Sequence, residues 1–117
     1  MNYNKTLGKL GEDIAIRFLK YKGYKVIEKN FSCRYGEIDI IAQNSKFLIF
    51  VEVKTRTNLN YGKPVEAVNK IKINHLYKAT KYYLYKRRKS DIPIRFDVIE
   101  VFISKNYCKV NHIKKID

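Results

Sequence analysis

Apolar residues recur every three or four positions in two parts of the chain, the spacing that is typical of amphipathic helices. The first stripe comprises Leu7, Leu10, Ile14 and Phe18. It predicts a helix over residues 5–22, which Gly23 ends. The second stripe comprises Ile73, Leu76, Tyr77, Thr80 and Tyr83 or Leu84. It predicts a long helix over residues 70–88, which stops before the break at residues 91–93.

Runs of β-branched and aromatic residues predict five strands. These span residues 24–31, 37–42, 47–53, 94–103 and 107–113. The short polar connection over residues 43–46 predicts a hairpin between the second and third strands. A loop is expected from Thr55 to Lys63, and Pro64 fits the first turn of a helical segment. Because a helix separates the third and fourth strands, parallel pairing is expected between them, giving an α/β domain with a mixed sheet flanked by helices.

Three charged residues interrupt two otherwise apolar strands. Asp39 lies within the run over residues 36–42, and Glu52 and Lys54 lie near the end of the run over residues 47–54. A buried acid is unfavourable unless a partner compensates it. With an even-length hairpin connection, Asp39 and Glu52 share one face of the sheet as opposed or diagonal neighbours, and Lys54 points to the same side. An odd-length connection without a bulge would separate them.

Two carboxylates on one face can hold a hard divalent cation, Mg²⁺ or Mn²⁺, together with water and a substrate phosphate. Lys54 could then position the attacking water or offset charge on the phosphorane. Phosphodiester hydrolysis is the chemistry that suits this set. The alternative is structural, because strands near a sheet edge use charges to block pairing with other chains, and Glu52 and Lys54 could form a plain ion pair.

The formal net charge of +14 over 117 residues favours a polyanionic partner, of which nucleic acid is the usual one. An acidic membrane surface is the runner-up, but no strongly apolar helix face is available for insertion. Lys70, Lys72, Lys78 and Lys81 could contact a phosphate backbone along the second helix, or form a solvated face. Arg34 and Arg56 bracket the acidic set and could grip phosphate.

Other residues carry weaker signals. The tyrosines of the second helix are expected mostly to pack with their phenols at the surface rather than to stack on bases. Asp97 is interpreted as an ion-pair partner of Arg95, and neither His75 nor His112 is given a catalytic role. Cys33 and Cys108 are expected to be free, partly buried thiols of a cytoplasmic protein, because no apolar signal region precedes the first helix. The length predicts one domain over residues 1–117.

Several motifs match a known family in order and spacing. They are Gly11-Glu12, GEIDIIA (36–42), FVEVKTR (50–56), YGKPVEAVN (61–69), Lys72 and RFDVIEV (95–101). Together they resemble the YraN-like family of small bacterial proteins, which is similar to the PD-(D/E)XK nuclease superfamily and to archaeal Holliday-junction resolvases.

The resemblance implies a restriction-endonuclease-like αβββαβ core. It also implies that Asp39 and Glu52 are metal ligands, that Lys54 is the catalytic lysine, and that Glu12 completes the metal shell. Glu37 belongs to the motif without a defined role, and Ile38 stands where the superfamily signature has proline.

The leading hypothesis is a metal-dependent endonuclease that acts on DNA, with branched or repair intermediates as candidate substrates. Resolvases act as symmetric pairs because a junction has two cleavage points, so a homodimer is left open. One alternative is a module with a nuclease fold that binds nucleic acid without cutting it. Another is a small scaffold whose basic face binds an acidic protein.

Overall fold

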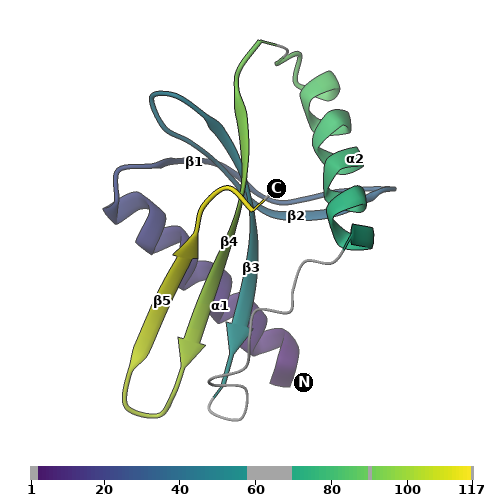
Figure 1. Cartoon of the computed structure of the whole chain (residues 1–117). Coiled ribbons are helices and arrows are strands. Elements are labelled where there is room, and N and C mark those ends of the chain that lie inside the picture. The colour runs from purple at the N-terminus through teal and green to yellow at the C-terminus, as the bar shows by residue number, and fades with distance from the viewer. Residues whose placement is uncertain (1–2, 58–69, 90, 117) are drawn as a thin grey trace.

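The computed structural model describes residues 3–57, 70–89 and 91–116, with side chains from residue 6 in the first helix and from residue 73 in the second. Five strands form one sheet in the order β1-β2-β3-β4-β5 (Figure 1). They are β1 (Lys25–Cys33), β2 (Gly36–Gln43), β3 (Leu48–Arg56), β4 (Ile94–Ile103) and β5 (Cys108–Ile113). Neighbouring strands are antiparallel except for β3 and β4, which are parallel as predicted.

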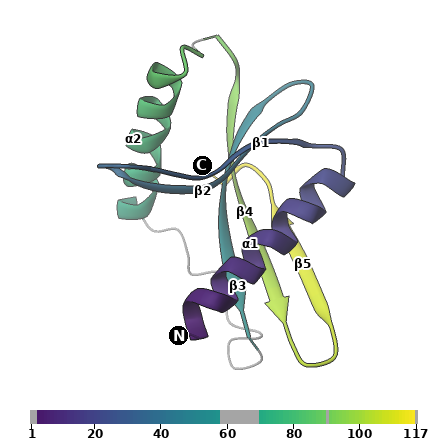
Figure 2. The same ribbon diagram turned by 180° about the vertical axis from the view of Figure 1, so that it is seen from behind.

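Two helices cover opposite faces of this sheet. α1 (Tyr3–Tyr21) crosses the face of β3 and β4, and α2 (Lys70–Lys86) lies against the β1–β2 end (Figures 1 and 2). Adjacent strand residues confirm the two layers. Ile40 and Val51 pack with Ala15 and Leu19 of α1. Their chain neighbours Ile41 and Phe50 pack on the other face with Leu76, Ala79 and Tyr83 of α2. The mixed α/β class and the order of elements agree with the sequence prediction.

The end of α1 shows why this helix stops where the sequence indicated. The amide of Gly23 donates to the Lys20 carbonyl at 3.0 Å, and the amide of Tyr24 donates to the Leu19 carbonyl at 2.9 Å. This is the Schellman arrangement, which needs a residue with positive φ. Gly23 supplies it with φ of 95°. In the part of the chain described here, no helix is long and apolar enough to cross a membrane.

The third strand is longer than predicted. Thr55 and Arg56 were expected in a loop, but they belong to β3 and lie beside Val101 and Phe102 of β4. Parallel pairing supplies partners for their backbone groups, which is why the polar composition does not end the strand. The rest of the predicted loop and the helical segment at Pro64 lie outside the described residues.

The two cysteines are free thiols, as expected. Cys33 is half-buried at the end of β1, but the prediction of partial burial is wrong for Cys108, which is exposed. Cys108 begins β5, which pairs with β4 alone and therefore forms an edge of the sheet.

Candidate metal centre

The candidate site lies at a fork between β2 and β3. The paired residues run from Gln43 with Leu48 to Ile40 with Val51, the register that an even-length turn gives. Asp39 and Glu52 follow the last pair directly. Here the backbone ladder ends, and Asp39 Oδ2 instead accepts a hydrogen bond from the amide of Val53 at 2.8 Å.

A twist of β2 produces the fork. Ile38 and Ile40 are two positions apart, so a regular strand would place both on the same face. Ile38 instead packs on the α2 side and Ile40 on the α1 side. The intervening Asp39 thus sits where β2 turns away from β3, and its carboxylate supplies the acceptor that the departing strand no longer offers to Val53.

Three carboxylates meet at this fork. One carboxylate oxygen each from Glu12, Glu37 and Asp39 lies within 4.8 Å of the others. Glu12 comes from α1, whereas Glu37 and Asp39 come from β2. The sequence placed Glu12 and Asp39 in one site through family resemblance but gave Glu37 no role. Its alternation with Asp39 along β2 was the available signal for including it.

Gly11 explains how Glu12 approaches the sheet. A Cβ atom at position 11 would overlap the side chain of Thr55 on β3. Glycine therefore lets α1 lie close to the strand at this point, and the following residue reaches the fork. In the Gly11-Glu12 pair, Gly11 thus allows the close contact with β3, and Glu12 contributes its carboxylate to the acidic cluster.

The electrostatics of the three acids are unfavourable without a cation. The pKa of Asp39 is raised to about 7, chiefly by burial and also by the charges of Glu52, Glu12 and Glu37, against the lowering effect of the Val53 hydrogen bond. Burial and the charge of Glu37 also raise the pKa of Glu12. Near neutral pH the cluster therefore retains protons or takes up a cation, and its oxygen ligands fit a hard divalent ion.

Asn30 is a neighbour of the acidic cluster that the sequence did not reveal. Its side chain forms a hydrogen bond with Glu12, which lowers the pKa of that carboxyl. The backbone of Asn30 has φ of 52°, a left-handed conformation that asparagine tolerates better than most residues. An asparagine in this bend of β1 thus faces the same acidic cluster.

Glu52 and Lys54 form an ion pair beside the cluster. Lys54 Nζ lies 3.5 Å from Glu52 Oε1, and both side chains are half-buried. Glu52 is close enough for its charge to raise the pKa of Asp39, but its carboxylate is outside the three-acid group. The structure therefore brings Glu12 and Asp39 together with Glu37, and it leaves Glu52 with Lys54.

The predicted phosphate-binding residues have different surroundings. Arg34 is exposed in the β1–β2 turn, where it donates a hydrogen bond to the Tyr35 hydroxyl at 2.7 Å. Arg56 is mostly buried and lies 3.7 Å from Glu100. Within the described residues, its Nε and Nη2 atoms have no hydrogen-bond partner. Lys70 and Lys72 lie in the first turn of α2, where side chains are outside the described set.

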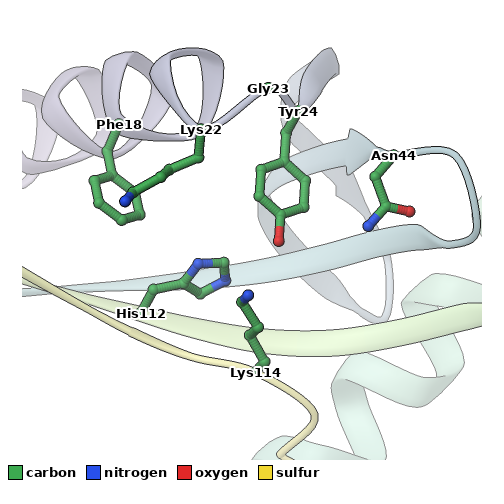
Figure 3. A pocket seen from close by; sticks show the side chains of 7 residues that line it. All are labelled: Phe18, Lys22, Gly23, Tyr24, Asn44, His112 and Lys114. Atoms are coloured by element: carbon green, nitrogen blue, oxygen red, sulfur yellow. The ribbon is translucent and has the colours of Figure 1, made fainter.

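A separate hollow of about 420 Å³ lies between the end of α1, the β2–β3 turn and the C-terminal strand (Figure 3). The side chains of Tyr24, His112 and Lys114 point toward one another there. Beneath them, the fully buried Asp97 contacts His112 Nε2 at 2.7 Å, and it pairs with Arg95 at 2.8 Å. The predicted ion pair of Asp97 and Arg95 is confirmed. The Tyr24 hydroxyl accepts a hydrogen bond from Arg95, and His112 contacts Asp97. We therefore interpret the hollow as the place where this buried ion-pair network reaches the surface.

The fold and site define a small α/β protein with an acidic cluster at a strand fork. The profile of the family described as "Uncharacterised protein family UPF0102" matches residues 11–101, which include all four predicted metal and catalytic residues. The chain belongs to this family, which is the YraN-like family indicated by the motifs.

The similar relatives are UPF0102 proteins from several bacteria. One from Geobacter metallireducens is 45% identical over 95% of this chain and 91% of its own length. One from Caldanaerobacter subterraneus is 46% identical over 93% of this chain and 92% of its own length. One from Clostridium perfringens is 44% identical over 96% of this chain and 93% of its own length. The similarity therefore spans the whole fold.

Proposed function

We propose that this protein is a metal-dependent endonuclease with a restriction-endonuclease-like core, and that it hydrolyses phosphodiester bonds in DNA. The observation that carries the proposal is the meeting of Glu12, Glu37 and Asp39 within 4.8 Å at the fork of β2 and β3. Such a group has little structural use, because its charges repel and partial burial disfavours those of Glu12 and Asp39. A site for Mg²⁺ or Mn²⁺ gives it one.

In this proposal Glu12 and Asp39 hold the cation, Glu37 supports them, and Glu52 joins as a further ligand by leaving Lys54. An ion held by these residues would polarise a phosphate oxygen and lower the pKa of a water. Asp39 is fixed for its role by the 2.8 Å hydrogen bond from Val53. Lys54 lies 3.5 Å from Glu52, so its ammonium is available at the fork to neutralise charge that develops on the phosphorane.

Charge supports a polyanionic substrate, and the resemblance of the motifs to junction resolvases makes DNA the proposed one. The formal net charge of +14 favours a polyanion. Branched or repair intermediates remain the proposed substrates, and a homodimer is proposed for branched DNA because two strands must be cut. Sedimentation with and without a four-way junction tests the oligomeric state directly.

Cleavage of branched, nicked and linear DNA in Mg²⁺ or Mn²⁺ tests the activity. Asp39→Asn keeps an acceptor for the Val53 amide but removes the charge, and we expect it to lower cleavage by at least about a hundredfold. Asp13→Asn is the matched control, because Asp13 is an exposed acid beside Glu12 and outside the three-acid group. Equal cleavage by the wild type and Asp39→Asn would overturn the mechanism.

A second function is favoured by one specific observation. Glu52 is paired with Lys54 rather than grouped with the other acids. A protein that binds nucleic acid without cutting it could retain this ion pair permanently. Such a module predicts salt-sensitive DNA binding that is independent of divalent ions, and no cleavage by any variant.

A further inference from the structure

A groove with tyrosine and lysine walls lies on the α2 side of the molecule. It has a volume of about 430 Å³. Its lining residues are Tyr35, Lys78, Lys81, Tyr82 and Tyr85. Tyr35 belongs to the β1–β2 turn, and the other four residues belong to α2. The end of the β1–β2 hairpin extends past α2 in both views of the fold (Figures 1 and 2).

The helix side of the groove is a continuous stripe. Lys78, Lys81, Tyr82 and Tyr85 are spaced three, one and three residues apart, which places them on neighbouring turns of one helix face. Ala79 and Tyr83 on the other face are buried in the core. The stripe is about 10 Å long at 1.5 Å per residue. It therefore presents two cations followed by two aromatic rings along the helix.

The exposure of the rings separates them into two groups. Tyr83 is 1% exposed and packs edge-on against Phe31 and Phe50 at 5.1 and 5.7 Å, which confirms a packing role. Tyr82 is half-buried, with its ring 6.3 Å from that of Tyr35. Tyr85 is 82% exposed, so it is an exception to the packing expected for most of these tyrosines. A large aromatic side chain held in water beside two lysines is available for a ligand.

Cations extend the groove at both sides. The Arg34 guanidinium lies 4.9 Å from the centre of the Tyr35 ring, and Lys86 Nζ lies 6.0 Å from that of Tyr82. Phosphates are attracted by such charges, and exposed tyrosine faces stack on bases of any sequence. A duplex keeps its bases stacked inside, so it would engage the lysines but not the rings. An acidic peptide would likewise leave the tyrosine faces without a partner.

We propose that this groove binds single-stranded DNA by stacking unpaired bases on Tyr35, Tyr82 and Tyr85. Glu37 follows Tyr35 by two positions, so their Cα atoms are at most about 7 Å apart. The Tyr35 end of the groove therefore lies within two residues of one acid of the cluster. If the proposed nuclease function holds, its substrate class is DNA with an unpaired strand next to the cleaved bond.

Binding in EDTA tests the groove without cleavage. The probes are fluorescent oligo(dT), an abasic strand of equal length and charge, a duplex, and a polyglutamate competitor. We expect the wild type to bind oligo(dT) at least about fivefold more tightly than the abasic strand, because stacking contributes about 1–3 kcal/mol per base. Equal affinity for oligo(dT) and the abasic strand would overturn the proposal. So would polyglutamate that displaces labelled oligo(dT) as well as unlabelled oligo(dT) of the same total charge.

The variants use two tyrosines of matched exposure. Tyr85→Ala should remove most of the preference for oligo(dT) over the abasic strand, whereas Tyr85→Phe should keep it because the ring remains. Tyr21→Ala is the control, since Tyr21 is 86% exposed on α1 and does not line the groove. Unchanged preference in Tyr85→Ala, or equal loss in Tyr21→Ala, would contradict the inference.

Two results separate this inference from the proposed nuclease function. Base-dependent binding that Tyr85→Ala abolishes supports the groove even if no substrate is ever cleaved. Asp39→Asn should bind oligo(dT) with at least wild-type affinity, because it removes negative charge at the fork and leaves the groove intact. A parallel loss of base preference in Asp39→Asn and Tyr85→Ala would contradict a separate groove.

Discussion

The carboxylate of Asp39 accepts a hydrogen bond from the backbone amide of Val53 at 2.8 Å, at the position where β2 leaves β3. The pKa of Asp39 in the folded protein is about 7, against an ordinary value of 3.8. Between these values the folded protein keeps a proton that the unfolded chain has released, so the free energy of unfolding decreases as the pH rises. Ionisation of Asp39 thus provides the charge of the site but lowers the stability of the folded protein at neutral pH.

Asp39→Asn should remove this pH dependence. The amide keeps an oxygen acceptor for Val53 and cannot ionise, so the variant should be more stable than the wild type at pH 8 in EDTA. The gain has an upper limit on the order of 4 kcal/mol, set by 1.36 kcal/mol per unit of pKa. Urea denaturation at pH 5 and pH 8 measures it, with Asp13→Asn as control. If the difference in the free energy of unfolding between the wild type and Asp39→Asn is the same at pH 5 and pH 8, the assigned pKa is contradicted.

Divalent ions should reverse the destabilisation. Binding to the folded state alone stabilises it by an amount that increases with ion concentration. We expect Mn²⁺ to raise the melting temperature of the wild type at pH 8, and to release protons on binding, because the cluster must ionise. Calorimetry in two buffers of different ionisation enthalpy measures the proton release. Glu12→Gln and Asp39→Asn should lose both effects, and retention in both variants would refute a site at the fork.

The close approach of α1 to β3 depends on glycine at one position only. Gly11→Ala should destabilise the protein by about 1–3 kcal/mol, because the new Cβ overlaps Thr55. Gly8→Ala is the matched control. It lies on the same helix with open space around it, so alanine there should stabilise by about 0.5–1 kcal/mol. Equal effects of the two substitutions on the free energy of unfolding would contradict this packing.

The sequence predicted most of the fold because its signals were local. Helical periodicity located α1 and α2, and strand parity indicated that Asp39 and Glu52 share one face of the sheet. Alternation along β2 also put Glu37 on the face of Asp39, but the meeting of Glu12 with these two acids could not be predicted in the same way. It depends on a twist of β2 that puts Ile38 and Ile40 on different faces, and on a helix contact made by Gly11. Both arise from tertiary packing, which strand alternation does not encode.

The end of α2 contains strain that a single substitution should relieve. The amide of Lys89 donates to the Leu84 carbonyl at 2.9 Å, and Arg88 has φ of 54° in the same turn. A left-handed arginine costs about 1–2 kcal/mol relative to glycine. Arg88→Gly should therefore raise the free energy of unfolding by up to about 1 kcal/mol after the entropy of glycine is included. Lys86→Gly, at the last residue of α2, should lower the free energy of unfolding instead. Thermal denaturation of both variants tests the sign.

The buried carboxylate of Asp97 should have the opposite pH dependence to Asp39. Burial would raise the pKa of Asp97, but hydrogen bonds from His112, Arg95 and the Lys115 amide hold it below its ordinary value. Its contribution to stability is therefore present above the ordinary pKa of 3.8 and is lost as the pH falls through the lower folded value.

Asp97→Asn should cost about 3–5 kcal/mol at pH 7, because Arg95 and His112 lose the anion that they share. The variant should also lose part of the acid-induced decrease in stability below pH 4, which urea denaturation at pH 3 and pH 7 measures. Asp91→Asn, at an exposed position, is the control and should change little. A cost below about 1 kcal/mol at pH 7 would show that the network under the Figure 3 hollow does not stabilise the fold.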